Sequence, residues 1–135
     1  MMHGKALLFE PEAAQAIIDA PTPAEAKALG RKIKNFDRKK WDQHADDIVE
    51  RGNYLKFGED EELKGYVEET KPKILVEAST TDRIWGIGFS AEDAPGKEDQ
   101  WGANRWVDFY LGMDLTLKNT RMGLALTRAR DKLIA

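Results

Sequence analysis

The spacing of apolar residues and the placement of helix-capping residues predict several helices. Thr22 can cap a helix that begins at Pro23, and Glu25 completes a capping box. This helix is predicted to run to about Ile33. A further helix is predicted after Asp37, because apolar residues there recur at roughly helical spacing. The residues that carry this pattern are Trp41, Ala45, Ile48, Val49 and Leu55.

Three more segments have helical character. Residues 11–19 are rich in good helix formers, and Pro11 suits a first-turn position. The acidic residues 59–62 suit the start of a helix that ends near Thr70, because carboxylates are favourable at a helix N-terminus. The last predicted helix has apolar residues at i, i+4, i+7 and i+11, namely Met122, Leu126, Ala129 and Leu133.

The pattern changes at residue 74. The run Ile74-Leu75-Val76 predicts a short buried strand, and residues 79–82 predict a turn. Residues 89–102 contain proline, glycines and many charged or amide side chains, so a long loop is predicted there. Without an internal repeat, low-complexity tract or linker, the chain is predicted to be one compact domain of the mainly α class, helical with a few short β-strands.

Composition narrows the classes of function. The 135 residues carry a net charge of −3, with 41% hydrophobic and 33% charged residues, which is a globular composition. The absence of cysteine excludes disulfides, thiolate nucleophiles and zinc fingers. The acidic balance argues against electrostatic wrapping of nucleic acid. Because His3 and His44 lack companion ligands at metal spacing, no metal is predicted. No cofactor is predicted either.

The segment from Glu77 to Gly88 is the first candidate for chemistry. Asp82 lies in a predicted turn, three residues before Trp85, and Gly86 follows the tryptophan. Asp82 can act as a general base or stabilise a cationic transition state, and Trp85 can stack on a base or sugar. The structural alternative is that Asp82 caps the turn and that Trp85 belongs to the core.

Charged residues elsewhere leave similar alternatives. Lys5 lies in an apolar segment, where it either extends to the surface or is held in a pocket that lowers its pKa and makes it a nucleophile. The basic residues between positions 31 and 40 either meet a phosphate or a DNA backbone, or form a simple surface. The acidic residues 59–62 are interpreted as a solvated helix start.

Several motifs together resemble the NADAR (YbiA-like) family. Residues 23–31 resemble its "P-x-E-A-K-x-L-G-R" helix, and residues 77–88 resemble its Glu-Ala-Ser…Asp…Trp-Gly-Ile-Gly block. The order continues with Trp-Gly-Ala-Asn-Arg at 101–105. A final helix carries Gly123, Leu126 and Arg130. The resemblance covers nearly the whole chain.

The resemblance implies a YbiA-like helical domain with N-glycosidase activity, which hydrolyses a bond between ribose C1 and a nitrogen. The implied substrates are ADP-ribose on guanine bases, including ADP-ribosylated nucleic acid, or ribosyl intermediates of riboflavin biosynthesis. No membrane partner is implied, and the expected compartment is the cytoplasm, with the nucleus as an alternative. The implied catalytic residues are Asp82 and Lys5, and the implied substrate-binding residues are Trp85, Gly86, Asn104 and Glu77.

The chain departs from the family pattern in two places. A glutamate-bearing segment of the family would lie before Met1, so the resemblance implies an N-terminally incomplete domain. Residues 106–120 interrupt the family order and are expected to be an insertion. These departures leave a second function open, a non-catalytic module that binds ADP-ribose or another nucleotide.

Overall fold

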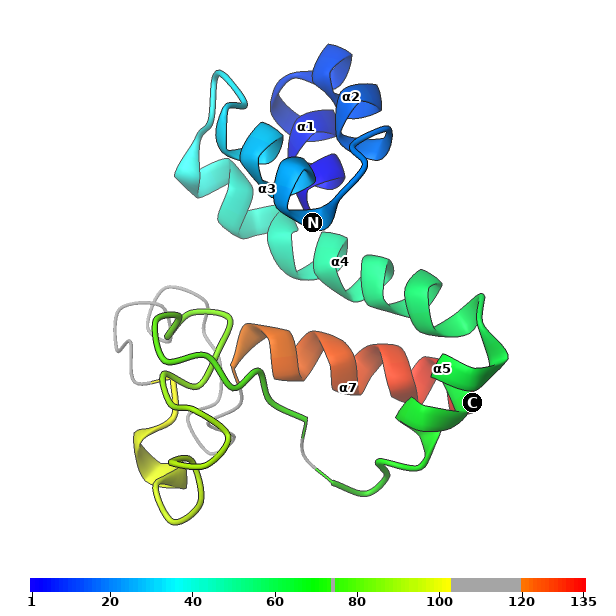
Figure 1. Ribbon diagram of the computed structural model, residues 1–135, viewed down its shortest axis with the longest axis vertical. Coiled ribbons are helices and arrows are strands. Elements are labelled where there is room, and N and C mark those ends of the chain that lie inside the picture. The colour runs from blue at the N-terminus through cyan, green and yellow to red at the C-terminus, as the bar shows by residue number, and fades with distance from the viewer. Residues whose placement is uncertain (74, 103–119) are drawn as a thin grey trace. The chain divides into compact units, whose positions relative to one another are not determined.

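The computed structural model describes residues 1–73, 75–102 and 120–135. It divides into two compact units, Met1–Gly52 and Asn53–Ala135, and each is described by itself. The helices of the first unit are α1 (Met2–Phe9), the short 3₁₀ helix η1 (Pro11–Ala13), α2 (Ala14–Ile18), α3 (Pro23–Arg31) and the first part of α4 (Arg38–Gly58) (Figure 1). The second unit contains the end of α4, then α5 (Glu61–Glu68), the 3₁₀ helix η2 (Glu98–Gln100) and α7 (Arg121–Ile134).

The first unit is built around a small apolar core between α1, α2 and α3. Its buried members are Ala6, Ala14, Ile17 and Ile33. The predicted helical character of residues 11–19 is confirmed, although a 3₁₀ turn begins the segment at Pro11. Alanine at two of these positions allows the short helices to pack closely, and this packing stabilises helices that would be marginal alone.

Helix α3 shows how far local signals determine a helix. The Thr22 side chain accepts a hydrogen bond from the Glu25 backbone N–H at 3.2 Å, as the capping box predicts. The Glu25 carboxylate accepts a further bond from the Thr22 hydroxyl at 3.0 Å. The helix ends at Arg31, two residues before the predicted end, and Ile33 then enters the core from outside the helix.

Helix α1 is absent from the sequence prediction. Met1 provides no side-chain cap, and the helix has no acidic residue in its first turn and no basic residue in its last. Local signals for a helix are therefore missing. Burial of Ala6 against the neighbouring helices stabilises α1, and no local sequence signal indicates this packing.

In the second unit, α5 and α7 pack against each other (Figure 1). Asp60 caps α5 by accepting a bond from the Leu63 N–H at 3.0 Å. Thr120, which is buried, caps α7 by accepting a bond from the Gly123 N–H at 3.3 Å. Both helices lie where the sequence predicts them.

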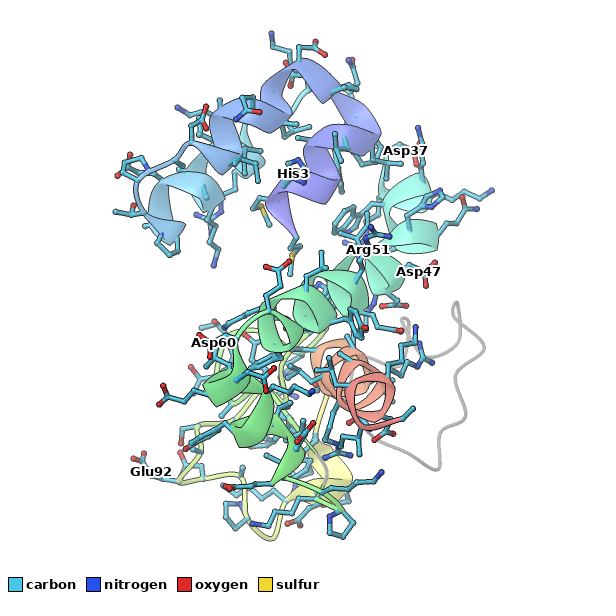
Figure 2. The ribbon with its side chains drawn as sticks, turned by 90° about the vertical axis from the view of Figure 1, so that its right-hand side faces the viewer. His3, Asp37, Asp47, Arg51, Asp60 and Glu92 are labelled. Atoms are coloured by element: carbon cyan, nitrogen blue, oxygen red, sulfur yellow. The ribbon has the colours of Figure 1, made fainter. Side chains whose placement is uncertain are left out.

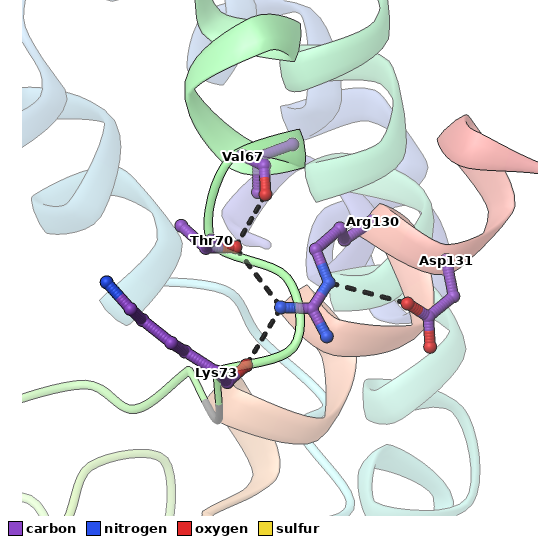
Figure 3. A network of polar contacts seen from close by, with 5 residues as sticks. All are labelled: Val67, Thr70, Lys73, Arg130 and Asp131. Carbon is purple, nitrogen blue, oxygen red and sulfur yellow. Dashed lines mark hydrogen bonds and ion pairs between the residues drawn. The ribbon is translucent and has the colours of Figure 1, made fainter.

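A buried arginine ties α7 to the chain that follows α5 (Figure 3). Arg130 is only 4% exposed, and its Nη1 donates to the Thr70 hydroxyl at 3.1 Å and to the Lys73 carbonyl at 2.9 Å. The Thr70 hydroxyl donates in turn to the Val67 carbonyl at 2.5 Å, and Asp131 pairs with Arg130 Nε at 3.4 Å. The network holds the segment that follows α5 against α7.

The mainly helical prediction is confirmed, but the predicted short strands are not. Leu75 and Val76 lie in irregular backbone, residue 74 lies outside the described residues, and residues 1–73, 75–102 and 120–135 contain no strand. The segment makes isolated contacts in place of a ladder. The Ile87 N–H donates to the Glu77 carbonyl at 2.9 Å, and Leu75 packs its carbonyl against Gly123. The apolar run over 74–76 indicates burial, but a strand also needs a second strand with which to pair.

The predicted long loop over 89–102 is confirmed, with η2 as one helical turn inside it. The Gly102 N–H donates to the Ile87 carbonyl at 3.1 Å, so the loop ends close to where it begins. The Trp101 indole donates to the Ala94 carbonyl at 3.2 Å across its middle. The expected insertion over 106–120 lies outside the described residues except for Thr120.

No helix in the described ranges combines the length and the apolar character that crossing a bilayer requires.

Candidate functional site

The Asp82 carboxylate organises the turn that carries the candidate site. Its Oδ1 accepts hydrogen bonds from the Ile84 N–H at 2.8 Å and from the Trp85 N–H at 2.9 Å. The Asp82 N–H donates to the Ser79 hydroxyl at 3.2 Å. The structural interpretation of Asp82 as a turn cap is therefore confirmed. Within the described part of the chain, its second oxygen, Oδ2, has no hydrogen-bond partner, so the cap uses only half of the carboxylate.

Gly86 allows the chain to close tightly behind this turn. A Cβ atom at this position would lie 2.9 Å from the Asp82 carbonyl oxygen and 3.1 Å from the Glu77 carbonyl oxygen. Real Cβ atoms essentially never come within 3.0 Å of a backbone atom, so the contact with the Asp82 carbonyl requires glycine unless the backbone shifts. Glu77, Asp82, Trp85 and Gly86, four of the residues predicted for the site, therefore lie in one small turn of the second unit.

The first turn of α7 holds the other side of this turn. The Arg121 N–H donates to the Ile84 carbonyl and the Met122 N–H donates to the Trp85 carbonyl, each at 3.3 Å. These N–H groups lie at a helix start, where no carbonyl of the same helix can accept from them. The carbonyls of Ile84 and Trp85 thus satisfy two N–H groups at the start of α7, and these bonds fix the backbone of Trp85.

Trp85 is half-buried, and Arg121 lies over its ring. The guanidinium carbon is 4.5 Å from the ring centroid, and Arg121 is 3% exposed. Trp85 is thus neither a fully buried core residue nor a free stacking surface, because a cation covers the ring. Sequence reasoning did not identify Arg121, since its contact joins residues 36 positions apart and no periodic pattern marks it.

Lys5 lies in the first unit, and the structure places it in a partly apolar environment. Its Nζ donates to the Gly30 carbonyl at 2.7 Å and lies 4.6 Å from the centroid of the Phe36 ring. Gly30 is in the last turn of α3, where carbonyls lack partners within the helix. Desolvation by burial lowers the pKa of the Lys5 amine below its ordinary value of 10.5. This direction is the one that the nucleophile interpretation requires.

The structure does not place all predicted site residues together. Asn104 lies outside the described residues, and Lys5 belongs to the other unit. Glu77, Asp82, Trp85 and Gly86 share the turn, and convergence of Lys5 and Asn104 on it stays a prediction.

Two residues of the basic stretch between positions 31 and 40 have local structural partners. Arg38 pairs with Asp42 at 2.7 Å, and Lys40 Nζ donates to the Leu8 carbonyl at 3.2 Å. This supports the surface interpretation of the basic stretch. His3 lies on α1, and Asp37 directly precedes α4 (Figure 2). Across the described ranges, no three histidine or acidic side chains gather in a way that could hold a metal ion.

Comparison with known proteins adds three relatives and a family. The model of the family described as "NADAR domain" matches residues 1–115. A protein named as an N-glycosidase in Acanthamoeba polyphaga mimivirus is 42% identical over 103 residues, covering 75% of this chain and 61% of the relative. Protein irg-1 of Caenorhabditis elegans is 34% identical over 110 residues, covering 78% of this chain and 52% of the relative.

A third relative, also named as an N-glycosidase, comes from Nostoc punctiforme. It is 36% identical over 69 residues, covering 51% of this chain and 44% of the relative. The matches therefore span about half the length of these curated relatives.

Proposed function

Because this chain belongs to the NADAR domain family, we propose that it is an N-glycosidase that hydrolyses a bond between ribose C1 and a nitrogen. Two of the similar proteins carry the name N-glycosidase, which supports this reaction class. The observation that supports Asp82 as the site of this reaction is that the two oxygens of its carboxylate are used differently. One oxygen builds the turn, and the other is left for chemistry.

Hydrolysis breaks the C1–N bond, adds the hydroxyl of water to C1 and leaves a proton on the departing nitrogen. Positive charge builds on the ribose ring as the bond breaks, and a fixed carboxylate nearby stabilises that charge. The hydrogen bonds to Oδ1 fix the Asp82 carboxylate before the substrate arrives. Such preorganisation lowers the cost of stabilising the transition state.

The other residues of the turn are proposed to bind the substrate. The backbone of Trp85 is held by α7, and Arg121 lies against one face of its ring, so the opposite face is proposed as a fixed wall for a base or ribose. Gly86 brings backbone close to the ligand, and Glu77 can accept hydrogen bonds from ribose hydroxyls. Asn104 is proposed as a further hydrogen-bonding residue. The substrates proposed are ADP-ribose on guanine and ribosyl intermediates of riboflavin biosynthesis.

Lys5 is proposed to act on an opened ribose. Its neutral amine would attack the C1 aldehyde, lose water and form an imine, which water later hydrolyses. The lowered pKa of Lys5 supports this role, since a larger fraction of the amine is then neutral. Borohydride would reduce the imine to a stable adduct, detectable by mass spectrometry of the peptide that contains Lys5. An adduct on another lysine, or none during turnover, leaves Lys5 as a phosphate or hydroxyl ligand.

The test of the reaction is a turnover assay beside a binding titration, with the full-length protein and guanine-linked ADP-ribose. We expect release of the free base together with a hydroxyl on ribose C1. Turnover in ¹⁸O-labelled water should place the label on that hydroxyl. Saturable binding without release would contradict the enzymatic proposal and identify a nucleotide-binding module.

A further inference from the structure

Two cationic side chains lie against the ring of Phe89, at the start of the loop 89–102 that follows the Asp82 turn. The Arg83 guanidinium carbon is 5.7 Å from the centroid of the Phe89 ring, and the Lys97 Nζ is 5.2 Å from it. Both distances lie within the range of cation–π attraction. Arg83 follows Asp82 directly, so this pair of cations adjoins the candidate site within the second unit.

The position of Arg83 is shaped by a glycine. Gly88 has a φ of +79°, and a Cβ atom there would lie 2.8 Å from Arg83 Cγ and 3.0 Å from its Nε. The arginine therefore folds back over Gly88 to reach the Phe89 ring. A side chain at position 88 would displace the arginine stem, and the backbone conformation also favours glycine.

Two carboxylates of the loop 89–102 accept hydrogen bonds from local donors. Glu98 accepts a bond from the Gly96 N–H at 3.0 Å, and the backbone N–H groups of Glu98 and Gly96 lower the pKa of its carboxyl. Asp93 accepts a bond from the Ser90 hydroxyl at 2.9 Å. Within residues 1–73, 75–102 and 120–135, neither Arg83 nor Lys97 forms an ion pair. Among the described residues, no carboxylate therefore competes with an anion for these two side chains.

We propose that Arg83 and Lys97 form an anion subsite that binds a phosphate group of the substrate beside the Asp82 turn. An anion that contacts both side chains is attracted by two positive charges at once. The guanidinium offers a planar fork that fits phosphate oxygens, and the ammonium adds a point charge. This inference rests on the proposed function and names the part of the substrate, a phosphorylated ribosyl group, that the turn itself leaves unbound.

The experiment measures binding instead of turnover. ADP-ribose carries two phosphates and a second ribose, and adenosine carries neither, so calorimetric titration of both, repeated at rising salt, measures the contribution of the anion. We expect Arg83→Gln and Lys97→Gln each to weaken ADP-ribose binding about tenfold or more, as loss of a charge-assisted contact does. Adenosine binding should stay unchanged. Lys27→Gln removes an exposed amine from α3 and is the matched control, with no expected effect.

Two further measurements test the proposal even if a glutamine variant folds poorly. Arg83→Lys retains the charge and should restore part of the affinity, and rising salt should weaken ADP-ribose binding to the unsubstituted protein but not adenosine binding. The proposal is overturned if the unsubstituted protein does not prefer ADP-ribose, if both glutamine variants bind it normally, or if they lose both ligands equally. Normal discrimination without release of base would overturn the proposed reaction and leave the subsite standing.

Discussion

The two units of the molecule use polar side chains in different ways. In Met1–Gly52, helices and the apolar core around Ala6 and Ile17 make the structure, and the bond from Lys5 to the Gly30 carbonyl is added to it. In Asn53–Ala135, residues 75–102 are mostly irregular, and polar bonds build the backbone itself. Asp82 holds one turn, and the first turn of α7 holds the next residues.

This difference explains where chemistry can be placed. Helix backbones satisfy their own hydrogen bonds, whereas an irregular segment needs side chains to satisfy its N–H and carbonyl groups. Such side chains are fixed in position and stay near the surface, which suits a reaction site. Asp82 combines both roles, because a carboxylate has two oxygens and the turn uses one of them.

The largest effect on stability is expected where a polar side chain is buried. Arg130→Met keeps the stem but removes the donors to the Lys73 carbonyl and the Thr70 hydroxyl. Loss of charged hydrogen bonds at a buried position should lower the free energy of unfolding by about 1.5–3 kcal/mol. Urea denaturation measures this.

Arg38→Met in the first unit is the matched control for Arg130→Met. It removes an exposed ion pair with Asp42, and a loss below about 0.5 kcal/mol is expected. Equal losses in the free energy of unfolding for both variants would contradict the idea that polar side chains contribute differently in the two units.

A somewhat smaller effect is expected from backbone packing at α7. Gly123→Ala would drive a methyl group into the Leu75 carbonyl, which cannot rotate away as a side chain can. The expected loss is about 1–3 kcal/mol in the free energy of unfolding. Gly65→Ala, in α5 with no atom within 4 Å of the added methyl, should gain about 0.5–1 kcal/mol. A gain at both glycines would show that the Leu75 contact is loose.

The smallest effect concerns pH and Lys5. Its folded pKa lies below the ordinary 10.5, so in the interval between the two values the unfolded chain binds more protons than the folded chain. The free energy of unfolding should therefore rise with pH across that interval. Lys5→Met should remove this rise, and Lys27→Met controls for the change in net charge. A difference between Lys5→Met and the unsubstituted protein that does not vary with pH would argue against a desolvated amine.

Elements with local signals could be predicted from the sequence. Thr22 and Pro23 mark the start of α3, and the apolar spacing from Met122 to Leu133 marks α7. Helix α1 lacks both kinds of signal, since its stability comes from packing. The run that ends at Val76 indicated burial, but whether a buried segment pairs into a sheet depends on partners far away in the sequence.

The candidate site divides in the same way. The role of Asp82 as a turn cap could be predicted, because it acts on residues two and three positions ahead. The cover of Trp85 by Arg121 and the meeting of Arg83 and Lys97 at Phe89 could not be predicted. These contacts depend on how the chain folds, so no rule on residue spacing predicts them.

The most direct test of the account separates the two oxygens of Asp82. Asp82→Asn retains an oxygen that can accept from Ile84 and Trp85 but loses the negative charge, so the free energy of unfolding should stay within about 0.5 kcal/mol of the original. Turnover should fall about 100-fold or more, because stabilisation of the transition state is lost. Asp82→Ala should lose both turnover and about 1–2 kcal/mol of stability. An Asp82→Asn variant that keeps turnover within about threefold, less than about 1 kcal/mol in barrier height, would reduce Asp82 to a turn cap.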